Sequence, residues 1–320
     1  MNVDQKPTRF SADGGPSLCV VATNNLTPTL NLTQGGNLMM AWRGLNSHDL
    51  WWSAYPFTSQ SALPSPTLGS PPSMCVASVG APQTGTCITQ LAWIANDSTT
   101  ILSASASATS STMESWSTPE PLAPLPVQPK SDAPVALTTN YDGICAFWKG
   151  ATSNELWWGS PNSSGVNQAT IPGAKNVFTG PGAAVQDGVN QWLPTWVFWA
   201  DEVGTFWGTM STNGYSWSTP QSGPGTPSLL EPAVAYFQGQ IVLMWANGAG
   251  AINYAVANLT DSGGFQWSPE GTLETQSGEP LTGASPALAV WNDTLYVAWS
   301  GYNDNRLWYA AYSEIPYPAS

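Results

Sequence analysis

Short apolar segments separated by polar turns rich in glycine and proline run along the whole chain. An apolar segment that ends in tryptophan recurs six times, as in LMMAW (38–42), ICAFW (144–148) and LYVAW (295–299). The six tryptophans lie 46 to 55 residues apart, at Trp42, Trp93, Trp148, Trp199, Trp245 and Trp299. A repeat of this length, with several short strands in each copy, predicts the blades of a β-propeller.

Each copy has the same order of elements. A proline opens an apolar strand upstream of the tryptophan, and proline is tolerated at the first residue of a strand because its missing N–H is not needed there. Downstream come a polar turn and a third strand, as in ELWWGS (155–160), and three copies continue into a further segment with Trp116, Trp217 or Trp267. We therefore expect four short strands per copy, with blade cores beginning near residues 28, 72, 134, 181, 232 and 286.

The last copy stops soon after its third strand, and residues 1–26 precede the first copy. An N-terminal strand that completes the last blade would close the ring and remove a free sheet edge. No segment keeps the 3.6-residue period of an amphipathic helix. The sequence predicts an all-β protein: one domain over 1–320, a single six-bladed β-propeller of four-stranded antiparallel blades, with seven blades as the alternative.

Charge narrows the possible partners. The chain has 20 acidic and 7 basic residues, and so lacks the basic surface that phosphate backbones require. No apolar run approaches the roughly 18 residues of a membrane-spanning helix, and the first residues do not resemble a signal peptide. We expect no nucleic-acid partner, no membrane insertion, and a protein that is cytoplasmic or secreted by a leaderless route.

Groups for metal or nucleophilic catalysis are scarce. His48 is the only histidine, which excludes a histidine metal cluster, and no lysine follows a glycine-rich phosphate loop. The four cysteines have no CxxC spacing; we interpret them as buried thiols, with a Cys75–Cys87 disulfide as an alternative. No cofactor or metal is expected, although the run Asn303–Asn305 leaves calcium as a minor alternative.

Two tryptophan series occur in the repeats. The first series, at the end of the second strand, is present in all six copies, as packing between blades requires. The second series lies in the third strand at Trp51, Trp157, Trp207 and Trp308, and is replaced by Leu102 and Asn253 in the other two copies. A binding position can be lost from single blades while the ring survives, so the second series indicates either binding residues or further packing between blades.

The turns that precede the second series are the other candidate positions. They read RGLNSHD (43–49), KGATSNE (149–155) and SGYNDNR (300–306). Sugar recognition combines an aromatic face with amide, carboxylate and guanidinium groups, whereas the alternative for any one turn is an ordinary solvated loop. The candidate ligand-binding residues are Trp51, Trp157, Trp207, Trp308, Arg43, Asp49, Asn154, Glu155, Asn303, Asp304 and Arg306.

Several segments resemble a known group of propellers. MSTNGYSWSTP (210–220) and TDSGGFQWSP (260–269) are similar to degenerate Asp-box turns of sialidase-like propellers. The pairs ICAFWKGATSNELWWGS and LYVAWSGYNDNRLWYAAYS resemble repeats of propeller lectins, including fungal fruiting-body lectins. Resemblance to sialidases implies a catalytic arginine triad, and resemblance to fucose-binding propellers implies an arginine in most blades. The only arginines here are Arg9, Arg43 and Arg306, which match neither pattern.

These observations predict a multivalent glycan-binding protein, a lectin without catalytic activity, whose partners are glycans or glycoconjugates. A glycoside hydrolase or lyase with one central carboxylate site is the first alternative. Its carboxylates would come from a set that includes Asp142, Asp187, Asp201, Glu202 and Glu231. A propeller that binds other proteins is the second alternative.

Overall fold

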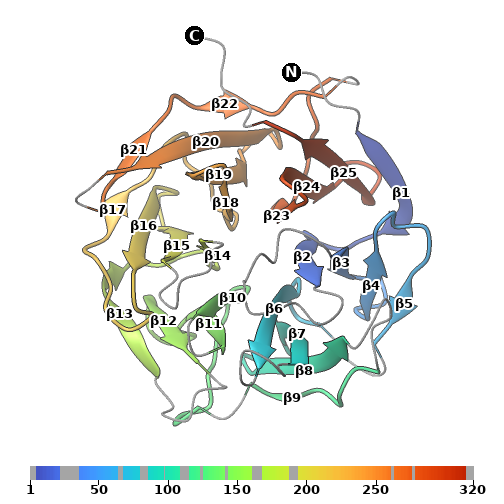
Figure 1. The fold of residues 1–320 in the computed structure, drawn as a ribbon, viewed down its shortest axis with the longest axis horizontal. Helices are drawn as coiled ribbons and strands as arrows, with labels where there is room; N and C mark the ends of the chain where they lie inside the picture. The colour runs from blue at the N-terminus through green and yellow to red at the C-terminus, as the bar shows by residue number, and fades with distance from the viewer. Residues whose placement is uncertain are drawn as a thin grey trace.

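The computed structural model is a ring of six antiparallel sheets around a central axis (Figure 1). It describes residues 5–21, 36–63, 68–79, 86–96, 98–108, 115–122, 125–140, 143–160, 168–186, 194–260, 263–275 and 278–314. Every described strand belongs to one of the six sheets, and these ranges contain no helix. The six-bladed, all-β propeller expected from the repeats is confirmed.

Four strands form each blade, with an additional short strand in blade 5. In blades 1 to 5 the chain passes from the innermost to the outermost strand before it enters the next blade. Blade 1 is β2 (Ser17–Val21), β3 (Asn37–Arg43), β4 (Leu50–Ala54) and β5 (Ser61–Ala62). Blade 2 is β6 (Ser73–Val79), β7 (Thr86–Ile94), β8 (Ile101–Ala108) and β9 (Glu120–Pro121). Blade 3 is β10 (Ala136–Asn140), β11 (Gly143–Lys149), β12 (Glu155–Gly159) and β13 (Gln168–Lys175).

The second half of the ring follows the same order. Blade 4 is β14 (Gly182–Val185), β15 (Thr195–Ala200), β16 (Phe206–Ser211) and β17 (Gln221–Ser222). Blade 5 is β18 (Ala233–Phe237), β19 (Gln240–Ala246), β20 (Ile252–Leu259) and β21 (Phe265–Trp267), and β22 (Gly271–Thr272) also pairs with β20. Blade 6 is β23 (Ala287–Trp291), β24 (Thr294–Ser300), β25 (Arg306–Tyr312) and the N-terminal β1 (Lys6–Ser11).

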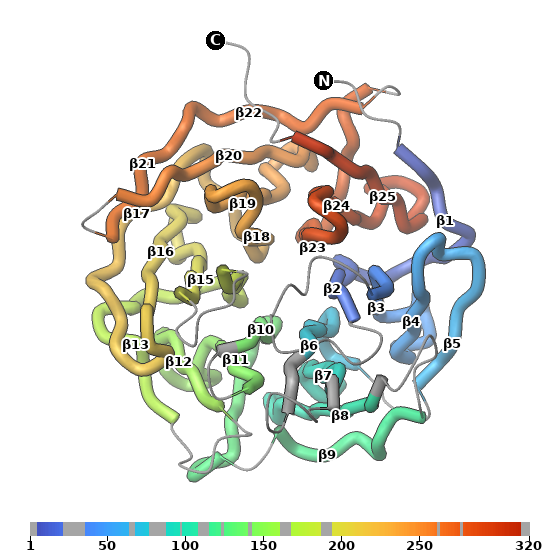
Figure 2. Tube along the Cα trace, in the orientation of Figure 1, coloured from blue at the N-terminus to red at the C-terminus, as the bar shows by residue number. Residues whose placement is uncertain are grey.

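Strand β1 closes the ring, as the sequence predicts. It is antiparallel to β25, with Lys6 opposite Tyr309 and Pro7 opposite Trp308. The N-terminal strand and the last strand of the chain therefore lie side by side (Figures 1 and 2). This pairing covers the edge of β25 that the C-terminal copy leaves open.

Two details of the predicted repeats are wrong. The innermost strand of blade 1 follows Pro16, not Pro28, which lies outside the described residues. The prediction failed because the connection between β2 and β3 is much longer than in blades 5 and 6, so the spacing to Trp42 is misleading. In addition, Trp116 and Trp217 precede the outer strands β9 and β17, and only Trp267 lies within an outer strand.

Hydrophobic clusters fill the gaps between neighbouring blades. All six tryptophans of the first series lie in these clusters and are at most 2% exposed, which confirms their predicted core role. Cys19, Cys75 and Cys145 are buried and Cys75 forms no disulfide, so the alternative Cys75–Cys87 bridge does not form. No helix long and apolar enough to span a membrane occurs in the described part of the chain.

Candidate functional site

The turns between second and third strands all lie on one face of the ring. Because neighbouring strands are antiparallel, the end of each second strand lies beside the start of the innermost strand. One backbone hydrogen bond closes the turn in every blade, from the N–H of Gly44, Ala95, Gly150, Asp201, Asn247 and Gly301 to the carbonyl at the start of the third strand. We call this surface, formed by these six turns and the connections into each innermost strand, the turn face.

Blades 1, 3 and 6 have a shared turn geometry that we did not identify from the sequence. A glycine lies seven residues before the third-strand tryptophan, and a serine or aspartate follows the glycine by three. A Cβ on Gly44, Gly150 or Gly301 would lie 2.7, 2.9 or 3.1 Å from the indole nitrogen of Trp51, Trp157 or Trp308. Glycine is therefore required because the indole packs directly against the turn. The spacing Gly-x-x-[Ser/Asp]-x-x-x-Trp was the available signal.

Hydrogen bonds attach two of the second-series indoles to their turns, one in blade 3 and one in blade 4. Trp157 donates its indole N–H to the Ser153 hydroxyl at 3.3 Å, and Trp207 donates to Asp201 Oδ2 at 2.9 Å. Asp201 Oδ1 also accepts the backbone N–H groups of Val203 and Thr205. These tryptophans therefore stabilise the turn conformation, in addition to any contact they make with a ligand.

All four second-series tryptophans are partly buried. Each packs against a cluster between its own blade and the preceding one. In blade 5, where Asn253 replaces the tryptophan, the space holds a polar network instead. Asn253 is 4% exposed and donates to Glu270, which also accepts the hydroxyl of Thr226 at 2.7 Å. In blade 5 the Asn253 amide and the Glu270 carboxylate thus form a hydrogen bond in the position that an indole ring takes in four other blades.

The predicted polar residues lie on three separate blades, not around one pocket. Alternate residues of a strand share one face, so Glu155 and Arg306 lie on the same blade faces as Trp157 and Trp308, whereas Asp49 directly precedes β4. Asp49 and Glu155 are partly buried. Asn154, Asn303, Asp304 and Arg306 are exposed. Asp304 Oδ1 accepts the backbone N–H of Arg306 at 3.0 Å, which fixes the carboxylate within the turn.

Arg43 does not share a face with Trp51. It pairs with Leu50, which packs into the gap between blades 1 and 2, whereas Trp51 packs in the gap between blades 6 and 1. The Arg43 guanidinium lies 3.4 Å from the carboxylate of Asp13. This pair belongs to the connection into blade 1 and therefore lies apart from the aromatic side of the turn.

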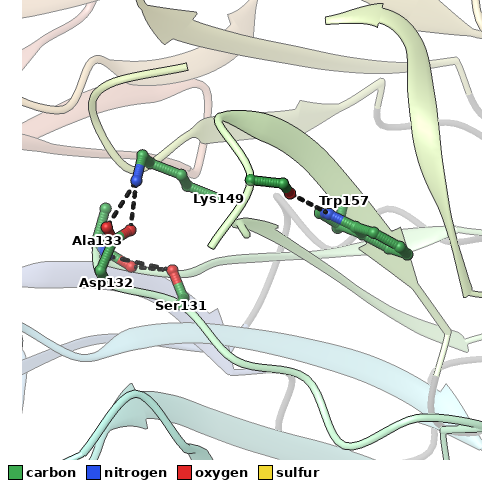
Figure 3. Close-up of polar contacts among 6 residues, drawn as sticks. Ser131, Asp132, Ala133, Lys149 and Trp157 are labelled. Atoms are coloured by element: carbon green, nitrogen blue, oxygen red, sulfur yellow. Dashed lines mark hydrogen bonds and ion pairs between the residues drawn. The ribbon is translucent and has the colours of Figure 1, made fainter. Parts of the chain in front are cut away.

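Blade 3 has an equivalent ion pair that the sequence analysis missed. Lys149 is 6% exposed, and its Nζ lies 2.6 and 2.7 Å from the two carboxylate oxygens of Asp132. Figure 3 shows Lys149 and Asp132 together, with Trp157 pointing away from them. Arg43 and Lys149 both end the second strand of their blade, so a cation here links that strand to the connection that leads into the same blade.

A narrow channel opens at the centre of the turn face. Its cavity of about 140 Å³ is lined by the prolines that precede or open the innermost strands and by one acidic residue, Glu231. The Ser285 hydroxyl donates to Glu231, and the Gly180 N–H also hydrogen-bonds to the carboxylate. Burial raises the pKa of Glu231, and these hydrogen bonds partly oppose the rise.

The other candidate carboxylates of a central site lie elsewhere or are not described. Asp201 belongs to a turn, and Glu202 is exposed on that turn. Asp142 and Asp187 lie outside the described residues.

No metal-binding cluster is evident in the described part of the structure. These ranges contain no group of three histidine, cysteine, aspartate or glutamate side chains placed to hold a metal ion. Asp304, the acidic residue of the candidate calcium turn, accepts the backbone N–H of Arg306 through Oδ1.

Solved structures of similar fold come from several functional classes. AofleA from Arthrobotrys oligospora has a TM-score of 0.65 and 11% identity, over 100% of this chain and 88% of that one. A mutant of the NanB sialidase from Streptococcus pneumoniae has a TM-score of 0.59 and 11% identity, over 96% and 70% of the two chains. The α-L-arabinofuranosidase arb93a from Fusarium graminearum has a TM-score of 0.57 and 11% identity, over 97% and 96%.

No protein-family model and no curated protein sequence matches the chain. At about 11% identity the structural likeness establishes the architecture alone. The protein is a six-bladed β-propeller that is similar in fold to fungal AofleA and to the NanB sialidase.

Proposed function

We propose that this protein is a glycan-binding propeller without catalytic activity that uses the turn face. The observation that supports this function most is the repeated turn of blades 1, 3 and 6, in which glycine, a serine or aspartate and tryptophan hold a polar tip in one conformation. Repetition of one geometry around a ring is typical of repeated binding, whereas a single catalytic site needs unlike groups on a few blades.

The chemistry of the turn tips supports neutral sugars. Asn154, Asn303 and Arg306 are exposed and offer amide and guanidinium groups that can donate to sugar hydroxyls. The partly buried Trp157 and Trp308 lie just inside these tips and contribute an apolar edge. Each such site is small and binds weakly on its own. Several sites on one rigid ring gain avidity for clustered glycans, so we propose multivalent binding.

A glycan array probed with the purified protein tests this function, followed by titration calorimetry on the best glycan. The proposal expects saturable binding that free sugar displaces. Asn303→Ala and Asn154→Ala should each weaken binding, whereas Gln266→Ala, an exposed change on the outer strand of blade 5, should not. If the protein binds no glycan on the array, the proposal is refuted and a propeller that binds other proteins is favoured.

Glu231 supports a second candidate, a glycoside hydrolase. A carboxyl group with a raised pKa in a central channel is suited to general-acid chemistry, and the names of similar structures include a sialidase and an arabinofuranosidase. Such a mechanism requires a second carboxyl group, and Glu231 is the only acidic side chain among the described residues lining this cavity. Chromogenic glycosides test this candidate, because hydrolysis abolished by Glu231→Gln would establish it.

A further inference from the structure

The exposed aromatic side chains of the described residues are not tryptophans of the second series. Tyr302 is 60% exposed, Phe178 is 48% exposed and Tyr215 is 39% exposed. Tyr302 lies in the turn of blade 6, directly after Gly301 and immediately before the run Asn303–Arg306 of exposed polar residues. An aromatic ring that presents most of its surface to solvent beside amide and guanidinium groups has the composition of a sugar-stacking position.

Two glycines lie close to the Tyr302 ring: Gly250 in the turn of blade 5 and Gly283 in the connection into blade 6. A Cβ on Gly250 would lie 3.5 Å from Tyr302 Cδ2, and a Cβ on Gly283 would lie 3.4 Å from the same atom. The backbone N–H of Tyr302 donates to the carbonyl of Leu281 at 3.1 Å. One side of the ring thus contacts the backbone at the junction of blades 5 and 6, and much of the rest is open to solvent.

The equivalent turn position lacks an aromatic side chain in every other blade. The conserved closing hydrogen bond aligns the six turns, and the residue after its donor is Leu45, Asn96, Ala151, Glu202, Gly248 or Tyr302 in blades 1 to 6. Leu45 is also exposed, at 37%, but its aliphatic side chain offers no flat face. The six turns therefore differ sharply in their ability to stack against a sugar.

We propose that Tyr302 forms the stacking platform of the principal sugar site, at the junction of blades 5 and 6. This inference rests on the glycan-binding function proposed above and names the site that dominates it. The ring would contact the C–H face of a pyranose, while Asn303 and Arg306 bind its hydroxyls and the 43% exposed Leu281 extends the apolar surface. The net charge of −13 and the carboxylate of Asp304 favour a neutral sugar over an acidic one.

Saturation-transfer NMR and calorimetry with methyl β-glucoside, methyl β-galactoside and N,N′-diacetylchitobiose test the inference. Tyr302→Ala should weaken binding of the best of these sugars about 5- to 10-fold, the loss expected for an aromatic stacking contact, whereas Tyr302→Phe should retain affinity. Tyr215→Ala is the matched control and should leave affinity unchanged, because Tyr215 is a 39% exposed aromatic residue between β16 and β17, outside the turn face. Gly283→Ala places a methyl group against the ring and should weaken binding less than Tyr302→Ala.

The outcomes distinguish this inference from the function on which it rests. If the wild-type protein binds none of these sugars and no glycan on an array, both fail. If sugar binds and Tyr302→Ala matches wild type while Asn154→Ala loses affinity, the principal site lies on blade 3 and only the present inference is overturned. Thermal unfolding of each variant identifies loss of fold. If Tyr302→Ala does not fold, Tyr302→Leu, which keeps an apolar side chain without a flat aromatic face, should still weaken binding.

Discussion

Trp299 and Trp308 lie directly opposite each other in the ladder between β24 and β25, yet their environments differ. Trp299 is 1% exposed inside the gap between blades 5 and 6, whereas Trp308 is partly exposed at its rim. The same contrast between the buried first series and the partly exposed second series occurs at Trp42 and Trp51. In each of these pairs, the first-series tryptophan packs in the core, and the second-series tryptophan lies beside the turn face.

This division predicts different costs for the two alanine variants. Trp299→Ala should lower the free energy of unfolding by about 3–5 kcal/mol, because it removes a large buried ring from the core. Trp308→Ala should cost less stability and should weaken glycan binding. Urea unfolding and calorimetry on both variants measure these effects. Equal losses of stability with unchanged binding would contradict the division.

The hydrogen bonds of Asp201 predict that this turn of blade 4 depends on one carboxylate. Asp201→Ala leaves the indole N–H of Trp207 and two backbone N–H groups without their acceptor, and should cost about 1–3 kcal/mol. Its exposed neighbour Glu202 is the control, because Glu202→Ala should change stability by less than about 0.5 kcal/mol. Urea midpoints give the comparison, and indistinguishable variants would show that the Asp201 bonds do not stabilise the fold.

The raised pKa of Glu231 predicts a pH dependence of stability. Because the folded state holds the Glu231 proton more tightly than the unfolded chain, its contribution to stability is fully present below the unfolded pKa of about 4.3. That contribution is lost as the pH rises through the higher folded pKa. Glu231→Gln lacks this titration, so the stability of wild type relative to the variant should fall with rising pH and then level off. A difference independent of pH would refute the shift.

The buried thiols should resist alkylation in the native protein. Burial raises the pKa of Cys19 to about 12 and raises that of Cys75, so the reactive thiolate is scarce at neutral pH. Iodoacetamide at pH 8, followed by peptide mass mapping, should label both cysteines slowly in buffer and rapidly in urea. Rapid labelling of native Cys19 would mean that the reagent reaches this buried thiol and that the thiol is ionised.

The sequence predicted the architecture because blade packing imposes a period on it. Each gap between blades needs a large buried side chain at the same place, so all six copies of the repeat keep the first-series tryptophan. Where packing does not fix the length of a connection, the prediction failed, as it did for the start of blade 1 at Ser17. The repeat therefore predicted the number of blades better than their boundaries.

The candidate site was less predictable, because its residues are determined by the face of the blade on which they lie and by their exposure to solvent. Arg43 and Trp51 are close in sequence but face different gaps, which becomes evident only from the ladder register. Tyr302 occupies a turn position whose exposure depends on glycines from another blade, Gly250 among them. Residue composition correctly indicated a turn rich in hydrogen-bonding groups, but it could not identify which aromatic ring faces the solvent.

Titration calorimetry of the wild-type protein with the best neutral glycan from an array is the most direct test of the central claim, provided that Asn303→Ala is measured beside it. The account predicts saturable binding that this turn variant weakens while its thermal stability stays unchanged. Absence of glycan binding, together with hydrolysis of a glycoside that depends on Glu231, would contradict the account and place the function in the central channel.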